Sequence, residues 1–179
     1  MQTEIVISGF GGQGVLFAGQ LLAYTAMENN NDVTWFPSYG PEMRGGTASC
    51  TVIVADEEIG SPIVSSPTAA VVMNLPSLEK YEPTIKPDGV LIVNSSMVDR
   101  PVERSGVHTV LIPATEIAET LGDKRMTNMV MLGGLLANLP VFSQALLEKV
   151  LRKYTPERHI RFMDFNLQAL NRGAAHRAI

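Results

Sequence analysis

The feature that most constrains the fold is a glycine-rich turn near the N-terminus, between an apolar run and an amphipathic stretch. The apolar run covers residues 5–7, the turn reads Gly-Phe-Gly-Gly-Gln-Gly over residues 9–14, and helical periodicity follows from Val15 to about Met27. A strand that passes through glycines into a helix is typical of a Rossmann-like first βα unit, whose free backbone amides at the helix start bind anions. We therefore expect such a unit and an anion-binding loop here.

Apolar runs and helical periodicity alternate along the rest of the chain. Strand-length runs rich in valine and isoleucine occupy residues 4–8, 33–37, 48–55, 69–73, 90–94 and 107–112. Helical periodicity covers residues 13–28, 114–121, 127–138 and 143–154, and a last helix is expected from Thr155 as cap and Pro156 in the first turn to about residue 172. Strands that are apolar on both faces belong to a sheet covered by helices on both sides. The pattern predicts an α/β fold, with three α/β/α layers.

The sheet is expected to be mostly parallel with some antiparallel pairing. The runs at 33–37 and 48–55 have no helix between them, so they can pair antiparallel and project residues 39–46 beyond the sheet edge. No polar tract or change of composition marks a domain boundary. We predict a single domain over residues 1–179, with a frayed tail over residues 173–179.

Charge and cysteine content exclude several classes of protein. The net charge is -4 and no window concentrates lysine and arginine, so we expect no nucleic-acid partner. The single cysteine, Cys50, excludes an internal disulfide, a thiolate zinc site and an iron-sulfur cluster held by this chain alone, and its apolar run predicts a small buried residue. No run approaches the ~18 apolar residues that span a bilayer, and we expect a cytoplasmic protein with no membrane partner. The three histidines lack metal-ligand spacing and are His108, His159 and His176.

The glycine spacing by itself leaves a dinucleotide site as an alternative. Gly9, Gly11 and Gly14 satisfy the G-x-G-x-x-G pattern of NAD-binding folds. An NAD site also needs an acidic side chain after the second strand, and Asp32 comes before that strand instead. The phosphate loop of ATPases is absent, because no G-x-x-x-x-G-K-[ST] sequence occurs. A stand-alone dinucleotide-binding oxidoreductase therefore remains the alternative function.

A second glycine-bearing loop reads Tyr-Gly-Pro-Glu-Met-Arg-Gly-Gly over residues 39–46. Arg44 offers a planar fork of donors for a carboxylate or phosphate, and Glu42 is close enough in sequence to orient it. The plainer interpretation is a Glu-Arg surface pair on a hairpin tip. The functional interpretation is favoured by the number of shape-determining residues, which are Tyr39, Gly40, Gly45 and Gly46.

Four segments together resemble one known family. Residues 9–14, 39–46, 59–62 and 128–133 are similar, in this order, to the gamma subunit of the 2-oxoacid:ferredoxin oxidoreductases. The resemblance extends over roughly residues 3–170, and it is nearest to members that act on 2-oxoglutarate or branched-chain 2-oxoacids. The small subunit of the related indolepyruvate oxidoreductases is also similar and stays an alternative.

The resemblance implies a subunit that is inactive alone. The complex would oxidatively decarboxylate a 2-oxoacid such as 2-oxoglutarate or pyruvate with coenzyme A, giving an acyl-CoA, CO2 and reduced ferredoxin. Its thiamine diphosphate, Mg and iron-sulfur clusters would lie on the alpha, beta and ferredoxin-like delta subunits, with no catalytic residue and no metal ligand in this chain. Such chemistry is supplied by the cofactors, and the sequence leaves the identity of the 2-oxoacid open.

The role of the two loops has two interpretations at this stage. The amides of Gly11, Gly12, Gln13 and Gly14, with Arg44, can receive a phosphate of coenzyme A. Equally, both loops can form a subunit interface. Whether the isolated chain forms a homodimer is also left open.

The helix predicted at 127–138 contains residues with mainly structural interpretations. Asn128 near its start suits a cap or a buried hydrogen bond as well as a ligand contact. Gly133 and Gly134 each cost ~1 kcal/mol relative to alanine inside a helix, so we expect close packing against another backbone there.

Overall fold

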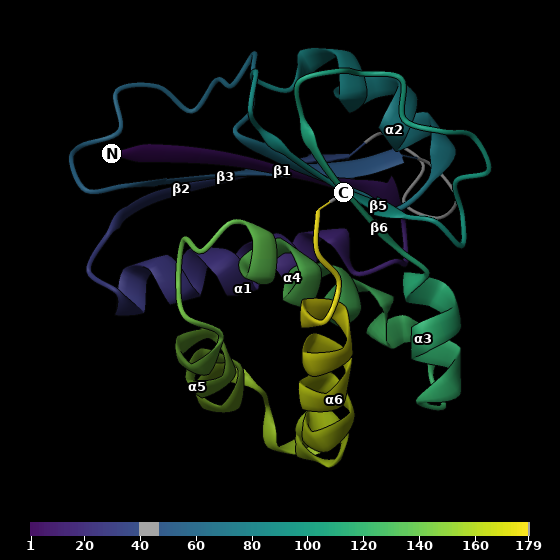
Figure 1. Ribbon diagram of the computed structural model, residues 1–179. Helices are drawn as coiled ribbons and strands as arrows, with labels where there is room; N and C mark the ends of the chain where they lie inside the picture. The colour runs from purple at the N-terminus through teal and green to yellow at the C-terminus, as the bar shows by residue number, and fades with distance from the viewer. Residues whose placement is uncertain (40–46, 179) are drawn as a thin grey trace.

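The computed structural model describes residues 1–39 and 47–178, and its central feature is a six-stranded sheet in the order β2-β3-β1-β4-β5-β6 (Figure 1). The predicted tip residues Gly40, Glu42, Arg44, Gly45 and Gly46 lie outside the described residues. The strands are β1 (Gln2–Phe10), β2 (Asp32–Tyr39), β3 (Thr47–Ala55), β4 (Ala69–Val72), β5 (Val90–Asn94) and β6 (His108–Ile112).

The sheet is mixed, because β3 runs against the other strands. It pairs antiparallel with both β1 and β2, whereas the pairs β1–β4, β4–β5 and β5–β6 are parallel. The predicted antiparallel pairing on either side of the second loop is therefore confirmed. Strand β2 forms one edge of the sheet and carries Pro37, opposite Cys50 of β3. A proline without a backbone N–H is tolerated in an edge strand.

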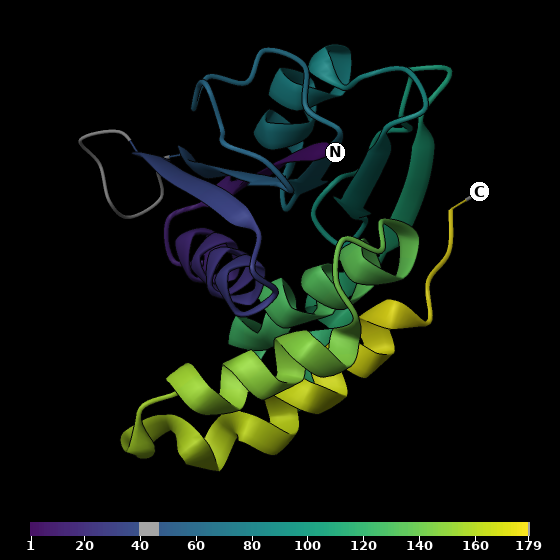
Figure 2. The same ribbon diagram turned by 90° about the vertical axis from the view of Figure 1, so that its left-hand side faces the viewer.

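Helices cover both faces of the sheet, as predicted. Figures 1 and 2 place α1 and α4 against one face, with α5 and α6 farther from the sheet, and α2 on the other face. The core between the sheet and α1 and α4 is the larger, and Leu78 of α2 belongs to a smaller core on the opposite face. The helices are α1 (Val15–Glu28), α2 (Leu75–Tyr81), η1 (Glu82–Thr84), α3 (Ala114–Thr120), η2 (Lys124–Met126), α4 (Thr127–Asn138), α5 (Gln144–Tyr154), η3 (Glu157–Phe162) and α6 (Met163–Ala174).

Helix α2 was not predicted from the sequence. It is only 7 residues long, so it shows no helical period, and Pro76 near its start looks like loop punctuation. The start is fixed locally, since the Asn74 Oδ1 accepts a hydrogen bond from the amide of Ser77 at 2.9 Å. Pro76 fits because the first turn of a helix needs no N–H from it.

The predicted last helix is wrong at its beginning. Residues 157–162 form the 3-10 segment η3, and the α-helix begins only at Met163. Thr155 does not cap this helix, because its Oγ1 donates instead to the carbonyl of Leu151, at 2.6 Å, at the end of α5. Thr155 and Pro156 both have extended ψ angles, which separates the two helices.

Helices α4 and α6 approach closely through glycines. A Cβ at Gly133 would lie 2.0 Å from the carbonyl oxygen of Leu170, and one at Gly173 would lie 1.8 Å from that of Val130. This confirms the expectation that the α4 glycines allow contact with another backbone. Beyond α6, within the tail predicted to fray, Asn138 donates to the carbonyl of His176 at 2.9 Å and accepts from the amide of Ala178 at 2.9 Å.

Candidate functional site

The glycine turn lies where ligands bind in open α/β sheets. It joins the carboxyl end of β1 to α1, which covers one face, while the neighbouring parallel strand β4 leads into α2 on the opposite face (Figure 1). The chain thus leaves adjacent strands in opposite directions, and the crevice at such a switch point is the usual ligand site of this fold type. The Rossmann-like first βα unit is confirmed.

The turn needs glycines because some of its residues have positive φ angles and because others have no room for a Cβ atom. Gly12 and Gly14 have φ angles of 99° and 74°, in the left-handed region that favours glycine. A Cβ at Gly14 would lie 2.3 Å from the Nδ2 of Asn128, and a Cβ at Gly9 would lie 2.6 Å from the Oε1 of Gln13. Side chains from the turn and from α4 therefore occupy the space that these glycines leave.

Gln13 and Asn128 hold the turn in place. The Oε1 of Gln13 accepts from the amide of Phe10 at 2.6 Å, and the Gln13 amide donates to the Phe10 carbonyl at 3.1 Å. Asn128, which is 5% exposed, donates through Nδ2 to the Gly14 carbonyl at 3.2 Å. The Gln13 amide, expected from the sequence to be free for a phosphate, is thus used inside the turn. Asn128 makes the buried hydrogen bond that the sequence left as one of its alternatives.

Other amides of the turn are available to a ligand. Within residues 1–39 and 47–178, the amides of Gly11, Gly12 and Gly14 donate to no acceptor. Helix α1 begins at Val15, its N-cap residue Gly14 supplies no side-chain cap, and its first turn has no acidic residue, so no negative charge offsets the positive end of the helix dipole. These donors border a cleft of about 420 Å³ that is lined by Phe10, Gly11, Gly12, Gly14, Val15, Leu16, Phe17 and Ala48.

The second loop begins and ends beside this cleft. Strand β2 ends at Tyr39 and β3 begins at Thr47, and the register pairs Tyr39 with Ala48 and Phe10 with Thr47. The ends of the two predicted loops therefore lie at the same edge of the sheet. The described part of the site combines free amides, apolar side chains such as Phe17, and the buried Asn128. Such a cleft can receive an anionic group attached to an apolar body.

Comparison with known proteins decides the family. The model of the family described as pyruvate ferredoxin/flavodoxin oxidoreductase matches residues 4–176. The chain belongs to the pyruvate ferredoxin/flavodoxin oxidoreductase family. The resemblance found in the sequence is thereby confirmed.

Two curated members of this oxidoreductase family are similar over most of the chain. The ketoisovalerate oxidoreductase subunit VorA of Methanothermobacter thermautotrophicus is 36% identical over 97% of this chain, which spans only 36% of the length of VorA. The 2-oxoglutarate synthase subunit KorC of Methanothermobacter marburgensis is 37% identical, with 87% of this chain and 88% of KorC covered. The chain thus matches nearly all of KorC but only about a third of the longer VorA.

Solved structures of family members have the same fold. The gamma subunit of keto/oxoacid ferredoxin oxidoreductase from Geobacter sulfurreducens superposes with a TM-score of 0.84 at 29% identity, covering 98% of this chain and 95% of that one. The 2-oxoglutarate:ferredoxin oxidoreductase from Magnetococcus marinus, with 2-oxoglutarate, coenzyme A and succinyl-CoA bound, gives 0.87 at 25% identity, covering 97% of this chain and 30% of that chain.

Residues 1–39 and 47–178 contain no cluster of three or more His, Cys, Asp or Glu side chains that could hold a metal ion. Within the same ranges, none of the helices has the length and apolar character needed to cross a bilayer.

Cys50 is a buried structural residue in this family member. It is 1% exposed, and its Sγ donates to the carbonyl of Val15 at 3.5 Å. Burial raises the pKa of the thiol to about 12. The sequence prediction of a small buried residue is confirmed.

We predict that Cys50 does not react with a thiol reagent while the chain is folded. The thiolate is the reactive form, and at pH 8 a thiol with this pKa is almost wholly protonated. Ellman's reagent should therefore label the chain only after urea is added, and the labelling rate should follow the unfolded fraction. Rapid labelling of native protein, with circular dichroism unchanged, would contradict this prediction.

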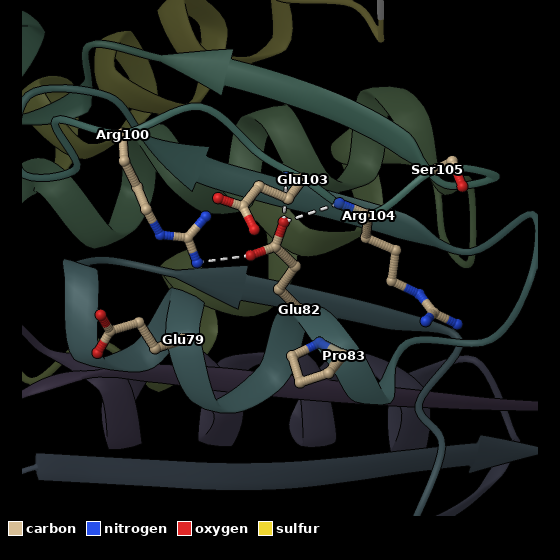
Figure 3. Close-up of a pocket in the computed structure, with 7 residues that line it drawn as sticks. All are labelled: Glu79, Glu82, Pro83, Arg100, Glu103, Arg104 and Ser105. Carbon is tan, nitrogen blue, oxygen red and sulfur yellow. Dashed lines mark hydrogen bonds and ion pairs between the residues drawn. The ribbon is translucent and has the colours of Figure 1, made fainter.

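A depression of about 500 Å³, lined by charged side chains and separate from the glycine cleft, was not predicted from the sequence (Figure 3). Its centre is Glu82, which is 5% exposed. The Oε2 of Glu82 accepts from the Nη2 of Arg100 at 2.6 Å, and its Oε1 accepts from the amides of Glu103 and Arg104 at 2.5 and 3.0 Å. The partners lie 18 to 22 residues away in an irregular segment, so the sequence offers no signal for them. Both carboxylate oxygens of Glu82 are hydrogen-bonded within the chain, which indicates a structural role. We call Glu82 and its bonds to Arg100, Glu103 and Arg104 the clamp.

We predict that this clamp makes stability depend on pH. Burial raises the pKa of Glu82, but the hydrogen bonds from Arg100, Arg104 and Glu103 outweigh it and hold the pKa below its usual value. The clamp therefore contributes above the unfolded pKa of about 4.3, and its contribution is lost as pH falls through the lower folded pKa. Glu82→Gln should cost about 2 kcal/mol at pH 7 and flatten the acid limb of stability measured by urea unfolding. Glu79→Gln is the control, because Glu79 is exposed and lines the same depression. If the stability of Glu82→Gln and of the wild type falls equally between neutral and acid pH, the clamp is refuted.

Proposed function

We propose that this chain is the gamma subunit of a multisubunit 2-oxoacid:ferredoxin oxidoreductase, which converts a 2-oxoacid and coenzyme A to an acyl-CoA, CO2 and reduced ferredoxin. The observation that carries the proposal is the match to KorC, which covers 88% of that subunit at 37% identity. The full-length superposition on the gamma subunit from Geobacter sulfurreducens supports it. The substrate class we favour is 2-oxoglutarate or a branched-chain 2-oxoacid.

The cofactors of such a complex are proposed to lie on other subunits. An iron-sulfur cluster needs several thiolates, and this chain has one cysteine, which is buried. The sequence also lacks a Gly-Asp-Gly run followed by paired asparagines, which the family uses to hold magnesium and thiamine diphosphate. Partners that supply these groups would be alpha, beta and ferredoxin-like delta chains, and this chain alone would be inactive.

The glycine cleft is proposed as this subunit's contribution to the complex. Its free amides at Gly11, Gly12 and Gly14 suit an anionic group, and the exposed Phe17 beside them suits an apolar surface. Asn128 would hold the turn in its binding conformation. Arg44, whose part rests on the sequence alone, would add a guanidinium. The anion is either a phosphate of coenzyme A or a carboxylate of a neighbouring subunit.

The proposed function is tested by recovering the complex from the native host. The chain, tagged and expressed at low level, should copurify with a thiamine-diphosphate-binding chain and a cysteine-rich ferredoxin-like chain. The eluate should reduce a dye in the presence of coenzyme A and one 2-oxoacid, and the preferred acid would identify the substrate. Recovery of a lone chain that binds a dinucleotide would refute the proposal and support a stand-alone oxidoreductase.

The two roles of the cleft can be separated by substitutions at Arg44. Lysine keeps the charge and loses the planar fork, so Arg44→Lys tests bidentate binding and Arg44→Ala tests charge. If the loop binds coenzyme A, the variants assemble normally and the KM for coenzyme A rises, most in Arg44→Ala. If the loop contacts a subunit, less partner is recovered and the KM of the remaining complex is unchanged.

A further inference from the structure

A row of serine hydroxyls crosses the sheet near its carboxyl edge, on the face that carries α2. Ser8 of β1 pairs in register with Ser49 of β3, and Ser49 pairs with Ser38 of β2. Residues directly opposite each other in adjacent strands project from the same face of a sheet. Ser77 of α2 extends the row, because its Oγ lies 2.9 Å from the Oγ of Ser8. We call Ser38, Ser49, Ser8 and Ser77 the hydroxyl row.

The hydroxyl row lines a small pocket with a cation at its rim. The pocket holds about 80 Å³, and besides the row it is lined by Thr47, Pro76 and Lys80. Lys80 follows Ser77 by three residues in α2, so both project from one side of that helix. Among the lining residues there is no carboxylate, and within the described ranges Lys80 forms no ion pair, while its Nζ lies 4.9 Å from the centre of the Tyr81 ring. The pocket therefore combines a positive charge with hydroxyl groups.

Several donors in this pocket lack an acceptor within the chain. Ser49 is 9% exposed, and in the described part of the chain its hydroxyl has no hydrogen-bond partner, nor have those of Ser38 and Thr47. The Ser8 hydroxyl can donate to the Ala48 carbonyl, at 3.4 Å, or to the Oγ of Ser77, at 2.9 Å. When it donates to Ser77, the Ser77 hydrogen is free to turn toward the pocket. Hydroxyls that rotate can all donate to one acceptor. An acceptor with several oxygens matches this arrangement.

A buried amide at the start of α2, outside the residues that line the pocket, also lacks an acceptor. Asn74 is 1% exposed and its Oδ1 accepts from the amide of Ser77, but its Nδ2 has no partner among the residues described. Asn74 follows β4, which pairs with β1 at the switch point. A buried donor without an acceptor costs roughly 1–3 kcal/mol, so it calls for an occupant or a structural reason.

We propose that this pocket binds a tetrahedral oxyanion of the phosphate type. The size suits one such group, the lysine supplies opposite charge, and the hydroxyls supply donors around it. The pocket lies on the α2 face and shares no lining residue with the glycine cleft, so the two sites are distinct. The oxyanion is either free phosphate or the phosphoryl end of a larger molecule. This proposal does not depend on the proposed role in a 2-oxoacid oxidoreductase.

The test measures phosphate binding by the full chain. Inorganic phosphate and glycerol 3-phosphate should each raise the unfolding temperature above that in chloride at the same ionic strength, and titration calorimetry should show one site. Lys80→Met should weaken binding about tenfold, since a charge-assisted hydrogen bond is lost. Ser49→Ala should weaken it less, because one neutral donor is removed from the row.

Lys149→Met provides the matched control, because Lys149 is also an exposed helical lysine but lies on α5, on the other side of the sheet. It should bind phosphate like the wild type. Binding of inorganic phosphate alone would identify a free-ion site, and binding of glycerol 3-phosphate alone would identify a site for a phosphoryl end. The proposal is overturned if neither binds, or if Lys80→Met and Lys149→Met bind equally well.

Discussion

Gly133→Ala should lower the free energy of unfolding by about 3 kcal/mol, although alanine is the better helix former by about 1 kcal/mol. The cause is the contact between α4 and α6, in which the new methyl carbon would lie 2.0 Å from the carbonyl oxygen of Leu170. A backbone atom of a packed helix cannot turn aside as a side chain can. The two helices would have to separate, and the core between them would lose its close packing.

The neighbouring glycine supplies a graded comparison. A Cβ at Gly134 would meet the Cδ1 of Ile112 at 2.2 Å, and that atom is the flexible end of a side chain. Gly134→Ala should therefore cost less, about 1–2 kcal/mol. Gly60 has nothing within 4 Å, so Gly60→Ala should change stability by no more than about 0.5 kcal/mol. Urea unfolding of all three variants checks the order, and equal values for Gly133→Ala and Gly60→Ala would contradict the observed contact.

Gly14→Ala should destabilise the chain by about 2 kcal/mol and lower the activity of the proposed oxidoreductase complex about tenfold or more. Alanine is strained at a φ of 74°, and its methyl carbon would lie 2.3 Å from the Nδ2 of Asn128. The turn would move away from α4, and the free amides of Gly11 and Gly12 would change direction. Activity is measured by 2-oxoacid-dependent dye reduction, and stability by urea unfolding of the isolated chain.

Two further variants separate strain from contact in this turn. Gly12 has a φ of 99° but nothing within 4 Å, so Gly12→Ala introduces strain without a clash and should cost about 1 kcal/mol. Asn128→Ala removes the group that Gly14→Ala would strike. The double variant Gly14→Ala/Asn128→Ala should therefore be more stable than the sum of the single effects predicts. Additive effects would show that Gly14 and Asn128 do not constrain each other.

The sequence predicted the framework of this fold because hydrophobic periodicity is a local signal. All six strands of the described sheet were expected within a few residues of their positions, as were α1, α3, α4 and α5. Helix α2 was missed because a short helix with Pro76 in its first turn has no period to detect. The start of the last helix was predicted at Thr155, whereas α6 begins at Met163. A Thr-Pro pair is typical of a helix start, but here Thr155 bonds to the last turn of α5.

Contacts between distant residues account for most of what the sequence could not predict about the site. The hydrogen bond from Asn128 to Gly14 joins residues 114 positions apart, and no local pattern indicates it. The role of Gln13 was also missed, because a side chain that closes its own turn has no sequence signature distinct from one that faces a ligand. The hydroxyl row depends on strand register, which fixes Ser8, Ser49 and Ser38 opposite one another.

Pro37 in strand β2 bears on how the chain resists aggregation. An edge strand offers unpaired N–H and C=O groups to any incoming strand, and one without such protection nucleates β-sheet aggregates. Pro37 leaves this edge strand with one N–H donor fewer, and the exposed Asp32 adds a charge at the start of the same strand. The sheet is therefore poorly suited to grow by adding a strand from another copy. A newly made chain is therefore less prone to form fibres along that edge.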